Sequence, residues 1–152
     1  MGYMVSTKGR YALRVLVDLA QHPDELQPLK DIADRQGISL KYMETIMPSL
    51  RKAGFVDGTH GKGGGYRLAR PAETYSVGEI LRVTEGSTAP VACLDSKNPC
   101  ERAAFCPTLP VWKELDSIIN DYLDSVKLTD LIMKGEIINI ERTRCSGVAS
   151  RR

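Results

Sequence analysis

Apolar residues recur at helical spacing in three successive stretches of the first half of the chain. The first stretch predicts a helix over Ser6–Ala20 and the second a shorter helix over Leu29–Gln36. Gly37 is expected to end the shorter helix, because glycine readily adopts the left-handed conformation that follows many helices. The third stretch predicts a helix over Ser39–Gly54, with Ser39 as its cap. That helix is expected to bend at Pro48, since its apolar spacing continues across the proline.

A hairpin with a glycine-rich tip is predicted directly after the third helix. Residues 55–56 and 66–68 suit short strands, and the loop between them contains the sequence HGKGGG over residues 60–65. Two helices joined by a tight turn and followed by a hairpin form a winged helix-turn-helix, whose second helix enters the DNA major groove. A nucleotide-binding loop is excluded, because Gly61-Lys62 is followed by Gly63 and a strand rather than by Ser or Thr and a helix.

The second half of the chain is predicted to hold a short helix, an irregular loop and a long helix. Helical spacing returns over residues 76–85 and 109–126, whereas residues 86–107 carry three prolines and no periodicity. The apolar positions of the long helix form a stripe that is wider than one core face needs, so we expect two copies of the chain to pair through it. The main members of this stripe are Val111, Leu115, Ile118, Ile119, Tyr122 and Val126.

The expected fold is mainly α with a small β wing, that is, a winged helix-turn-helix with a long C-terminal dimerisation helix. Four segments follow from the pattern. Residues 1–85 form the DNA-binding domain, and residues 86–108 form a cysteine-bearing loop. Residues 109–135 form the dimerisation helix and a short following helix, and residues 136–152 form a flexible polar tail.

Charge and composition fit a DNA-binding protein without requiring one. The net charge of +2 is small, but residues 1–70 carry 11 Lys and Arg against 7 Asp and Glu, whereas the remainder is slightly acidic. The positive excess therefore coincides with the predicted DNA-binding domain. No apolar run approaches the roughly 18 residues of a membrane span, and the first seven residues do not resemble a signal peptide. The sequence predicts a cytoplasmic protein with no membrane partner.

Polar and charged residues of the third helix and the hairpin are the candidates for contact with double-stranded DNA. Hydroxyl groups and Lys or Arg can bind phosphate, Lys can also read guanine, and Glu can accept from cytosine. The alternative for each residue is an ordinary solvated surface side chain, but the combination of fold and local charge favours DNA. The candidates are Ser39, Lys41, Tyr42, Glu44, Thr45, Arg51, His60, Lys62 and Arg67.

Three cysteines lie within 14 residues of the irregular loop. Cys93, Cys100 and Cys106 are separated by six and then five residues, and Cys145 lies far away. Clustered thiols in a cytoplasmic protein indicate metal or redox chemistry rather than disulfides. The spacing differs from the short pairs of zinc ribbons, so an iron–sulfur cluster, a thiol switch without metal and three ordinary thiols all stay open.

Several motifs, in the same order along the chain, resemble the iron–sulfur cluster regulator (IscR) family of winged-helix transcription factors. The resemblance spans about residues 4–132. It rests on STKGRYA at 6–12, IADRQGIS at 32–39, LRKAG at 50–54, GKGGGY at 61–66, VGEI at 77–80 and the three-cysteine loop before Trp112.

The resemblance implies a homodimer, a cofactor and a regulatory role. Family members pair through the helix that corresponds to residues 109–126. The cysteine-bearing members bind a cluster, commonly 2Fe–2S, through cysteines that match Cys93, Cys100 and Cys106. A glutamate at the place of Glu44 is a specificity element in the family. A basic residue usually stands at the place of His60, so minor-groove contact is expected to be weaker or pH-dependent here.

One departure from the family pattern leaves the fourth cluster ligand unknown. Members of the family carry a histidine three residues after the third cysteine, and here that place is Leu109, which cannot bind metal. The leading interpretation is a repressor that senses a cluster and controls genes of iron–sulfur assembly or sulfur metabolism. The alternatives are a regulator of cysteine metabolism acting with a protein partner, whose known examples lack the cysteine loop, and a sensor of nitric oxide or redox state. An enzyme is not expected, because no nucleophile and base are paired in the sequence.

Overall fold

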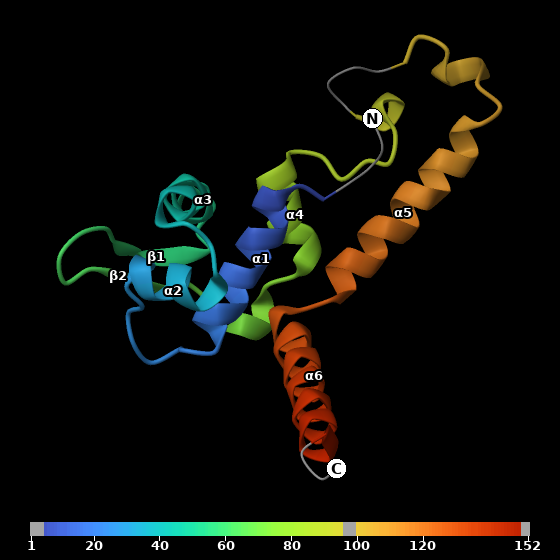
Figure 1. The fold of residues 1–152 in the computed structure, drawn as a ribbon. Coiled ribbons are helices and arrows are strands. Elements are labelled where there is room, and N and C mark those ends of the chain that lie inside the picture. The colour runs from blue at the N-terminus through green and yellow to red at the C-terminus, as the bar shows by residue number, and fades with distance from the viewer. Residues whose placement is uncertain (1–4, 96–99, 150–152) are drawn as a thin grey trace.

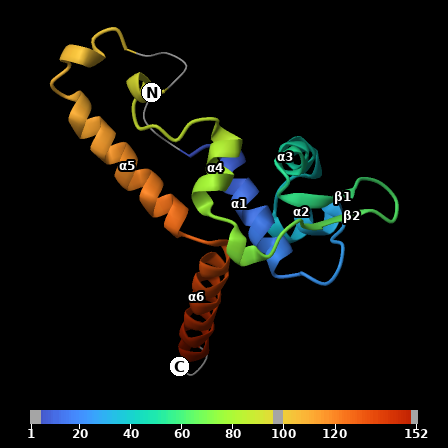
Figure 2. The same ribbon diagram turned by 180° about the vertical axis from the view of Figure 1, so that it is seen from behind.

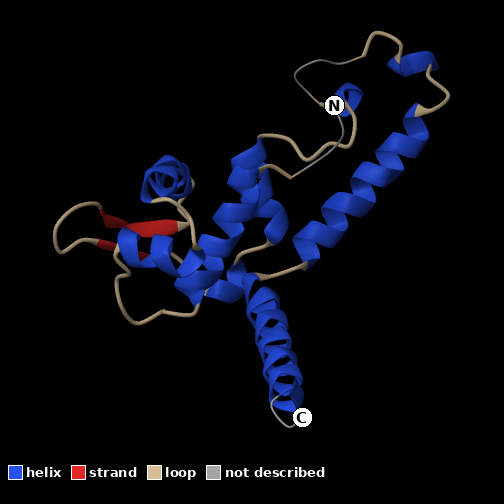
Figure 3. Cartoon of the chain, viewed as in Figure 1, coloured by secondary structure: helices blue, strands red, loops and turns tan. Residues whose placement is uncertain are grey.

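The computed structural model describes residues 5–95 and 100–149 and shows a helical body with two projecting arms (Figure 1). The body consists of α1 (Thr7–Ala20), α2 (Leu29–Gln36), α3 (Leu40–Lys52), α4 (Val77–Glu85) and the hairpin strands β1 (Val56–Thr59) and β2 (Gly65–Leu68). The arms are α5 (Leu109–Ser125) and α6 (Leu128–Ala149), which diverge from one end of α4 (Figure 2). The hairpin is the only sheet in the described part of the chain, so the predicted fold class is confirmed (Figure 3).

Serine side chains fix the starts of three helices of the body. The hydroxyls of Ser6, Ser39 and Ser76 accept hydrogen bonds from backbone amides of the first turns of α1, α3 and α4. A cap of this kind stabilises a helix by about 1 kcal/mol, because it satisfies an amide that has no helical partner. At the other end of α2, Gly37 has a φ of 64°, as the predicted turn requires. The helix α3 continues across Pro48, which confirms that it is a single element.

The hairpin packs against the body through a third short segment that the sequence did not reveal. Within the hairpin, the antiparallel register of β1 and β2 pairs Val56 with Leu68 and Thr59 with Gly65. The backbone of Gln27 then exchanges two hydrogen bonds of 2.8 Å with Tyr66, so the loop before α2 lies beside β2. This bridge ties the wing to the helix-turn-helix.

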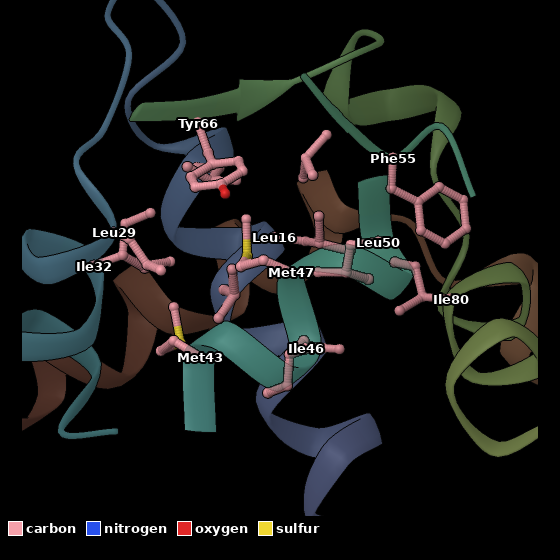
Figure 4. Close-up of a cluster of buried hydrophobic side chains, with 14 of the residues drawn as sticks. Leu16, Leu29, Ile32, Met43, Ile46, Met47, Leu50, Phe55, Tyr66 and Ile80 are labelled. Atoms are coloured by element: carbon pink, nitrogen blue, oxygen red, sulfur yellow. The ribbon is translucent and has the colours of Figure 1, made fainter. Parts of the chain in front are cut away.

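One apolar core joins α1, α2, α3 and the hairpin (Figure 4). Leu16 lies at its centre, with Ile32 from α2 and Met47 from α3 packed around it, all nearly or fully buried. The core also takes in Tyr75 and Leu128, which lie outside the predicted apolar faces. The Tyr75 hydroxyl donates a 2.7 Å hydrogen bond to the carbonyl of Phe55, so burial of this polar group is compensated.

The end of the chain differs from the prediction of a short helix and a flexible tail over residues 136–152. The helix α6 continues to Ala149, and only residues 150–152 of the predicted tail lie outside the described residues. The helix begins where the Lys127 amide donates a 2.8 Å hydrogen bond to the Asp130 carboxylate. Polar residues and Gly135 interrupt the apolar spacing, so this helix gives no amphipathic signal in the sequence. The predicted loop likewise contains two short 3₁₀ helices, η2 (Ala92–Leu94) and η3 (Ala103–Phe105).

Candidate nucleic-acid interface and cysteine loop

The helix α3 separates its apolar residues from its candidate DNA-contacting residues. Met43, Ile46, Met47 and Leu50 are buried in the core. Ser39, Lys41, Glu44 and Thr45, which lie between and before them in the sequence, are exposed. Because the helix is anchored along one whole face, its polar face is held rigidly outward. The structure therefore brings together on one surface four of the residues predicted to contact DNA.

Two residues of this face also have local structural roles. The Tyr42 ring is half-buried and packs edge-to-face against Tyr11 of α1, with ring centroids 5.5 Å apart. The Thr45 hydroxyl donates a 2.7 Å hydrogen bond to the Tyr42 carbonyl, and Ser39 caps the helix. A hydroxyl that is already a donor within its own helix offers only its lone pairs outward, so Thr45 is less suited to bind phosphate than the sequence predicted.

The hairpin presents His60, Lys62 and Arg67 to solvent, as predicted. Arg67 stands opposite Asp57 in the strand register, so a neighbouring carboxylate partly offsets its charge. Gly58 has a φ of 153°, and a Cβ there would lie 2.0 Å from the backbone oxygen of Gly65. This glycine therefore allows the two strands to approach each other closely.

A cleft of about 820 Å³ separates α3 from the wing. Glu44 and Arg51, both predicted to contact DNA, line it from α3, and His60 lines it from the wing. Lys52 also lines the cleft and was not among the predicted DNA-contacting residues, because the sequence gives no sign that the wing folds back beside the last turn of α3. The full lining is Leu29, Glu44, Met47, Pro48, Arg51, Lys52, His60 and Tyr66. The cleft has three basic groups and one carboxylate at its polar wall, which suits a phosphate backbone.

An ion pair with a buried carboxylate holds α1 against α2. Arg35 donates two hydrogen bonds, of 2.6 and 3.1 Å, to the Asp18 carboxylate, and Gln36 donates a third of 2.8 Å. Burial by itself raises the pKa of Asp18, but these hydrogen bonds and the positive charge of Arg35 outweigh it and hold the pKa below its ordinary value. Arg35 also donates to Gln27, the residue that bridges to the wing. No sequence signal identified this network, because its members are distant in sequence and belong to no motif.

The cysteine loop exposes its thiols to different degrees. Cys93 and Cys106 are half-buried, Cys100 is exposed, and all three are free thiols. A hydrogen bond from the Thr108 hydroxyl, 3.3 Å from the Cys106 sulfur, lowers the pKa of that thiol. This favours the thiolate, which is the form that binds metal. Within residues 5–95 and 100–149, however, no three Cys, His, Asp or Glu side chains are gathered as a metal site requires. The donor chemistry thus fits a soft metal centre, whereas the predicted common site is not formed by the described residues.

The start of the loop is fastened to the helices α1 and α5. At its start, Glu85 accepts hydrogen bonds of 2.7 and 3.1 Å from the hydroxyl and amide of Ser6, the cap of α1. Near its start, the buried Thr88 donates to Asn120 of α5. Arg82 of α4 bonds the Asp124 carboxylate of α5 at 2.6 Å. The loop therefore lies between two helices whose relative position depends on a few polar contacts. Leu109, which occupies the place of the family's histidine, is buried at the start of α5.

The arm α5 carries an apolar surface with no cover from the described body. Val111, Leu115, Ile118 and Tyr122 are all exposed, whereas α5 packs on α4 through its polar residues. We call these four residues the α5 stripe. Large apolar side chains in one exposed row indicate a protein interface.

A helix-turn-helix with an outward polar face and an adjacent wing defines this chain as a DNA-binding transcription regulator of the winged-helix class. The chain belongs to the Rrf2 family, described as an iron-dependent transcriptional regulator, which matches residues 5–134. It is 39% identical to the HTH-type transcriptional regulator IscR of Vibrio vulnificus (strain YJ016) over 137 residues. These residues are 90% of this chain and 81% of that relative. Family membership confirms both the predicted resemblance and the prediction that the chain is not an enzyme.

Two solved structures share the fold at substantial sequence identity. T. potens IscR has a TM-score of 0.68 and 38% identity, covering 89% of this chain and 90% of that one. CymR, the global cysteine regulator of B. subtilis, has a TM-score of 0.69 and 34% identity, covering 86% and 97%. In the part of the chain that the structure describes, no helix is both long and apolar enough to cross a membrane.

Proposed function

We propose that this chain acts as a homodimeric repressor that binds promoter DNA through α3 and the wing and responds to an iron–sulfur cluster in the cysteine loop. The observation that carries the proposal is the polar, outward face of α3 beside the basic cleft. In this arrangement Lys41 and Glu44 face base edges, and Arg51, Lys52 and His60 accommodate the phosphate backbone in the cleft. Lys62 at the tip of the wing binds phosphate or enters the minor groove.

The α5 stripe supports pairing of two copies. Burying four large apolar side chains from each copy stabilises association, at about 25 cal/mol per Å² of apolar surface removed from water. Two-fold pairing would also place two copies of α3 on one face, about 34 Å apart along the DNA, as palindromic operators require.

Cys93, Cys100 and Cys106 would hold the cluster, which would supply a reversible redox or occupancy signal when bound. The pKa of Cys106 is lowered by Thr108, which favours a thiolate at this position. The contacts Glu85–Ser6 and Arg82–Asp124 tie the surroundings of the loop to α1 and α5. A change in loop conformation can therefore shift the body relative to the dimer arm, and with it the spacing of the two recognition helices.

The experiment on DNA uses operators selected from a random duplex library, followed by Kd measurements on substituted proteins. Lys41→Ala should weaken binding, and Glu44→Ala should relax base choice, by about 1–3 kcal/mol at the base concerned. Lys62→Ala should weaken all sequences alike and reduce the slope of log K against log salt by about one unit. Lys134→Ala, an exposed lysine on the α6 arm, is the control and should change neither quantity. Unchanged binding in the first three variants would refute the assignment of α3 and the wing.

The experiment on the cofactor is the visible absorbance of protein purified without oxygen. Substituting Ala at Cys93, Cys100 or Cys106 should in each case abolish the absorbance, whereas Cys145→Ala in α6 should retain it. Absorbance that survives all three loop substitutions would refute the ligand set.

The likeness to CymR favours a second candidate, a regulator of cysteine metabolism that acts with a protein partner. A parent protein that binds DNA but shows no visible absorbance would favour this candidate. A DNA affinity that responds to thiol oxidation without any metal would favour a redox sensor instead.

A further inference from the structure

A histidine–glutamate pair spans the cleft between α3 and the wing. The Nε2 atom of His60 lies 3.8 Å from Oε1 of Glu44, with 63% and 47% of the two side chains exposed. Sixteen positions separate these residues in sequence, and the pair exists only because the hairpin folds back beside α3. Both residues are free to meet DNA, since neither is enclosed by the body.

The charges around the pair are otherwise basic. His60 borders two hollows, and the charged residues that line them are Glu44, Arg51 and Lys52 from α3 and Lys30 from α2. Lys62 follows two positions later on the wing itself. Glu44 is thus the single carboxylate among these lining residues. A carboxylate in a surface that approaches phosphates raises the electrostatic free energy of the complex unless a cation stands beside it.

We propose that His60 is the counter-ion of Glu44 in the DNA complex, so that operator binding is accompanied by proton uptake at His60. This inference rests on the proposed DNA-binding surface. Imidazole is the side chain that gains charge between pH 5 and 8, and both Glu44 and the phosphates in the cleft favour its charged form. Arg51, Lys52 and Lys30 line the same hollows as His60, and phosphates that enter the cleft on binding would offset the charge of these cations.

The sign of the effect follows from this linkage. The complex binds more protons than the free components, so affinity is highest at low pH and falls as pH rises through the range in which imidazole loses its proton. An exposed ion pair contributes a small free energy, equivalent to about a two- to fivefold change in Kd per protomer. At a pH above the range in which imidazole loses its proton, Glu44 lacks a charged partner on the protein. DNA sequences that offer a base hydrogen bond to the Glu44 carboxylate should therefore lose the least affinity as pH rises.

The test measures Kd of the full chain for a duplex obtained by selection at neutral pH, at steps from about pH 6 to about pH 8. The parent Kd should rise about two- to fivefold per protomer over this range. His60→Gln should remove the rise, and His60→Lys should bind with little pH dependence because its charge is permanent. Glu44→Gln should reduce the rise, since only the phosphates then favour the proton. His22→Gln, which changes the other histidine of the chain, should keep the parent behaviour.

The outcomes separate the inference from the proposed function. A His60→Gln protein that keeps the full pH dependence, or a Glu44→Gln protein whose dependence equals that of the parent, would overturn the inference while leaving DNA binding intact. Failure of the parent protein to select any duplex would overturn the proposed function, and the inference with it.

Discussion

Among the described residues, two Arg–Asp pairs have the same contact distance and very different burial, and this contrast allows a prediction about stability. Arg35 and Arg82 each place Nη2 2.6 Å from an aspartate Oδ1. The Asp18 side chain of the first pair is only 3% exposed and Arg35 is 36% exposed, whereas Arg82 and Asp124 are 42% and 47% exposed. We predict that Asp18→Ala costs far more free energy of unfolding than Asp124→Ala.

The magnitude follows from what each substitution leaves behind. Removing one partner of a fully buried pair costs about 3–5 kcal/mol, because the other charge stays uncompensated. Arg35 is partly exposed, so water can reach it after the substitution, and we lower the expected cost of Asp18→Ala to about 2–4 kcal/mol. Three hydrogen bonds to the carboxylate are lost at the same time. The exposed pair should contribute about 0–1 kcal/mol, since solvent screens it.

The assay is urea unfolding monitored by circular dichroism for the parent, Asp18→Ala and Asp124→Ala proteins. The slope of the free energy of unfolding against urea concentration is compared among the three. A similar slope would show that the difference in midpoint reports stability. The pKa of Asp18 is lowered in the folded state, so its contribution is complete above its ordinary value of 3.8 and is lost as pH falls through the lowered value. Acid should therefore destabilise the parent more than Asp18→Ala. Equal costs for the two substitutions at neutral pH would refute the reasoning from burial.

Three further predictions address the arms and the wing. Ile118→Asp should give monomers in sedimentation velocity if the α5 stripe pairs two copies. The control Ser117→Asp, at an exposed position off the stripe, should stay dimeric. A parent protein that is monomeric at micromolar concentration would argue against the dimer. Gly58→Ala should disrupt the hairpin and weaken DNA binding, because its Cβ would lie 2.0 Å from the Gly65 oxygen, and parent-like Kd values would contradict this. Gly135→Ala should stabilise α6 by up to about 1 kcal/mol, since no heavy atom lies within 4 Å of the added Cβ, and a loss of helical ellipticity would count against a continuous α6.

Local patterns in the sequence were sufficient to predict the helix-turn-helix and the wing. The spacing of Met43, Ile46, Met47 and Leu50 defined the buried face of α3, and Ser39 and Gly37 marked the adjacent helix ends. These features depend on interactions within a few residues, which the order of side chains along the chain specifies directly. The same reasoning placed Lys41, Glu44 and Lys62 on the surface and grouped the three cysteines in one irregular loop.

The sequence pattern was insufficient where an element lacked periodicity or an interaction joined distant residues. The helix α6 was predicted too short because polar residues and Gly135 conceal its period, although packing of Leu128 against the body fixes its start. The buried charge of Asp18 was missed, since an aspartate in an apolar stretch gives no indication of its partner. Its partner Arg35 is brought to it only when α2 packs on α1.

Local patterns along the chain specified the class of fold, most of its helices and the hairpin, and the residue types at the proposed DNA-binding surface. Tertiary packing alone set which residues face one another: Glu44 with His60 across the cleft, and Arg82 with Asp124 between body and arm. This division arises because the two kinds of feature depend on interactions of different range. Helix and turn formation are governed by neighbours along the chain, whereas burial, pairing of charges and the shape of a cleft depend on how separate elements pack together.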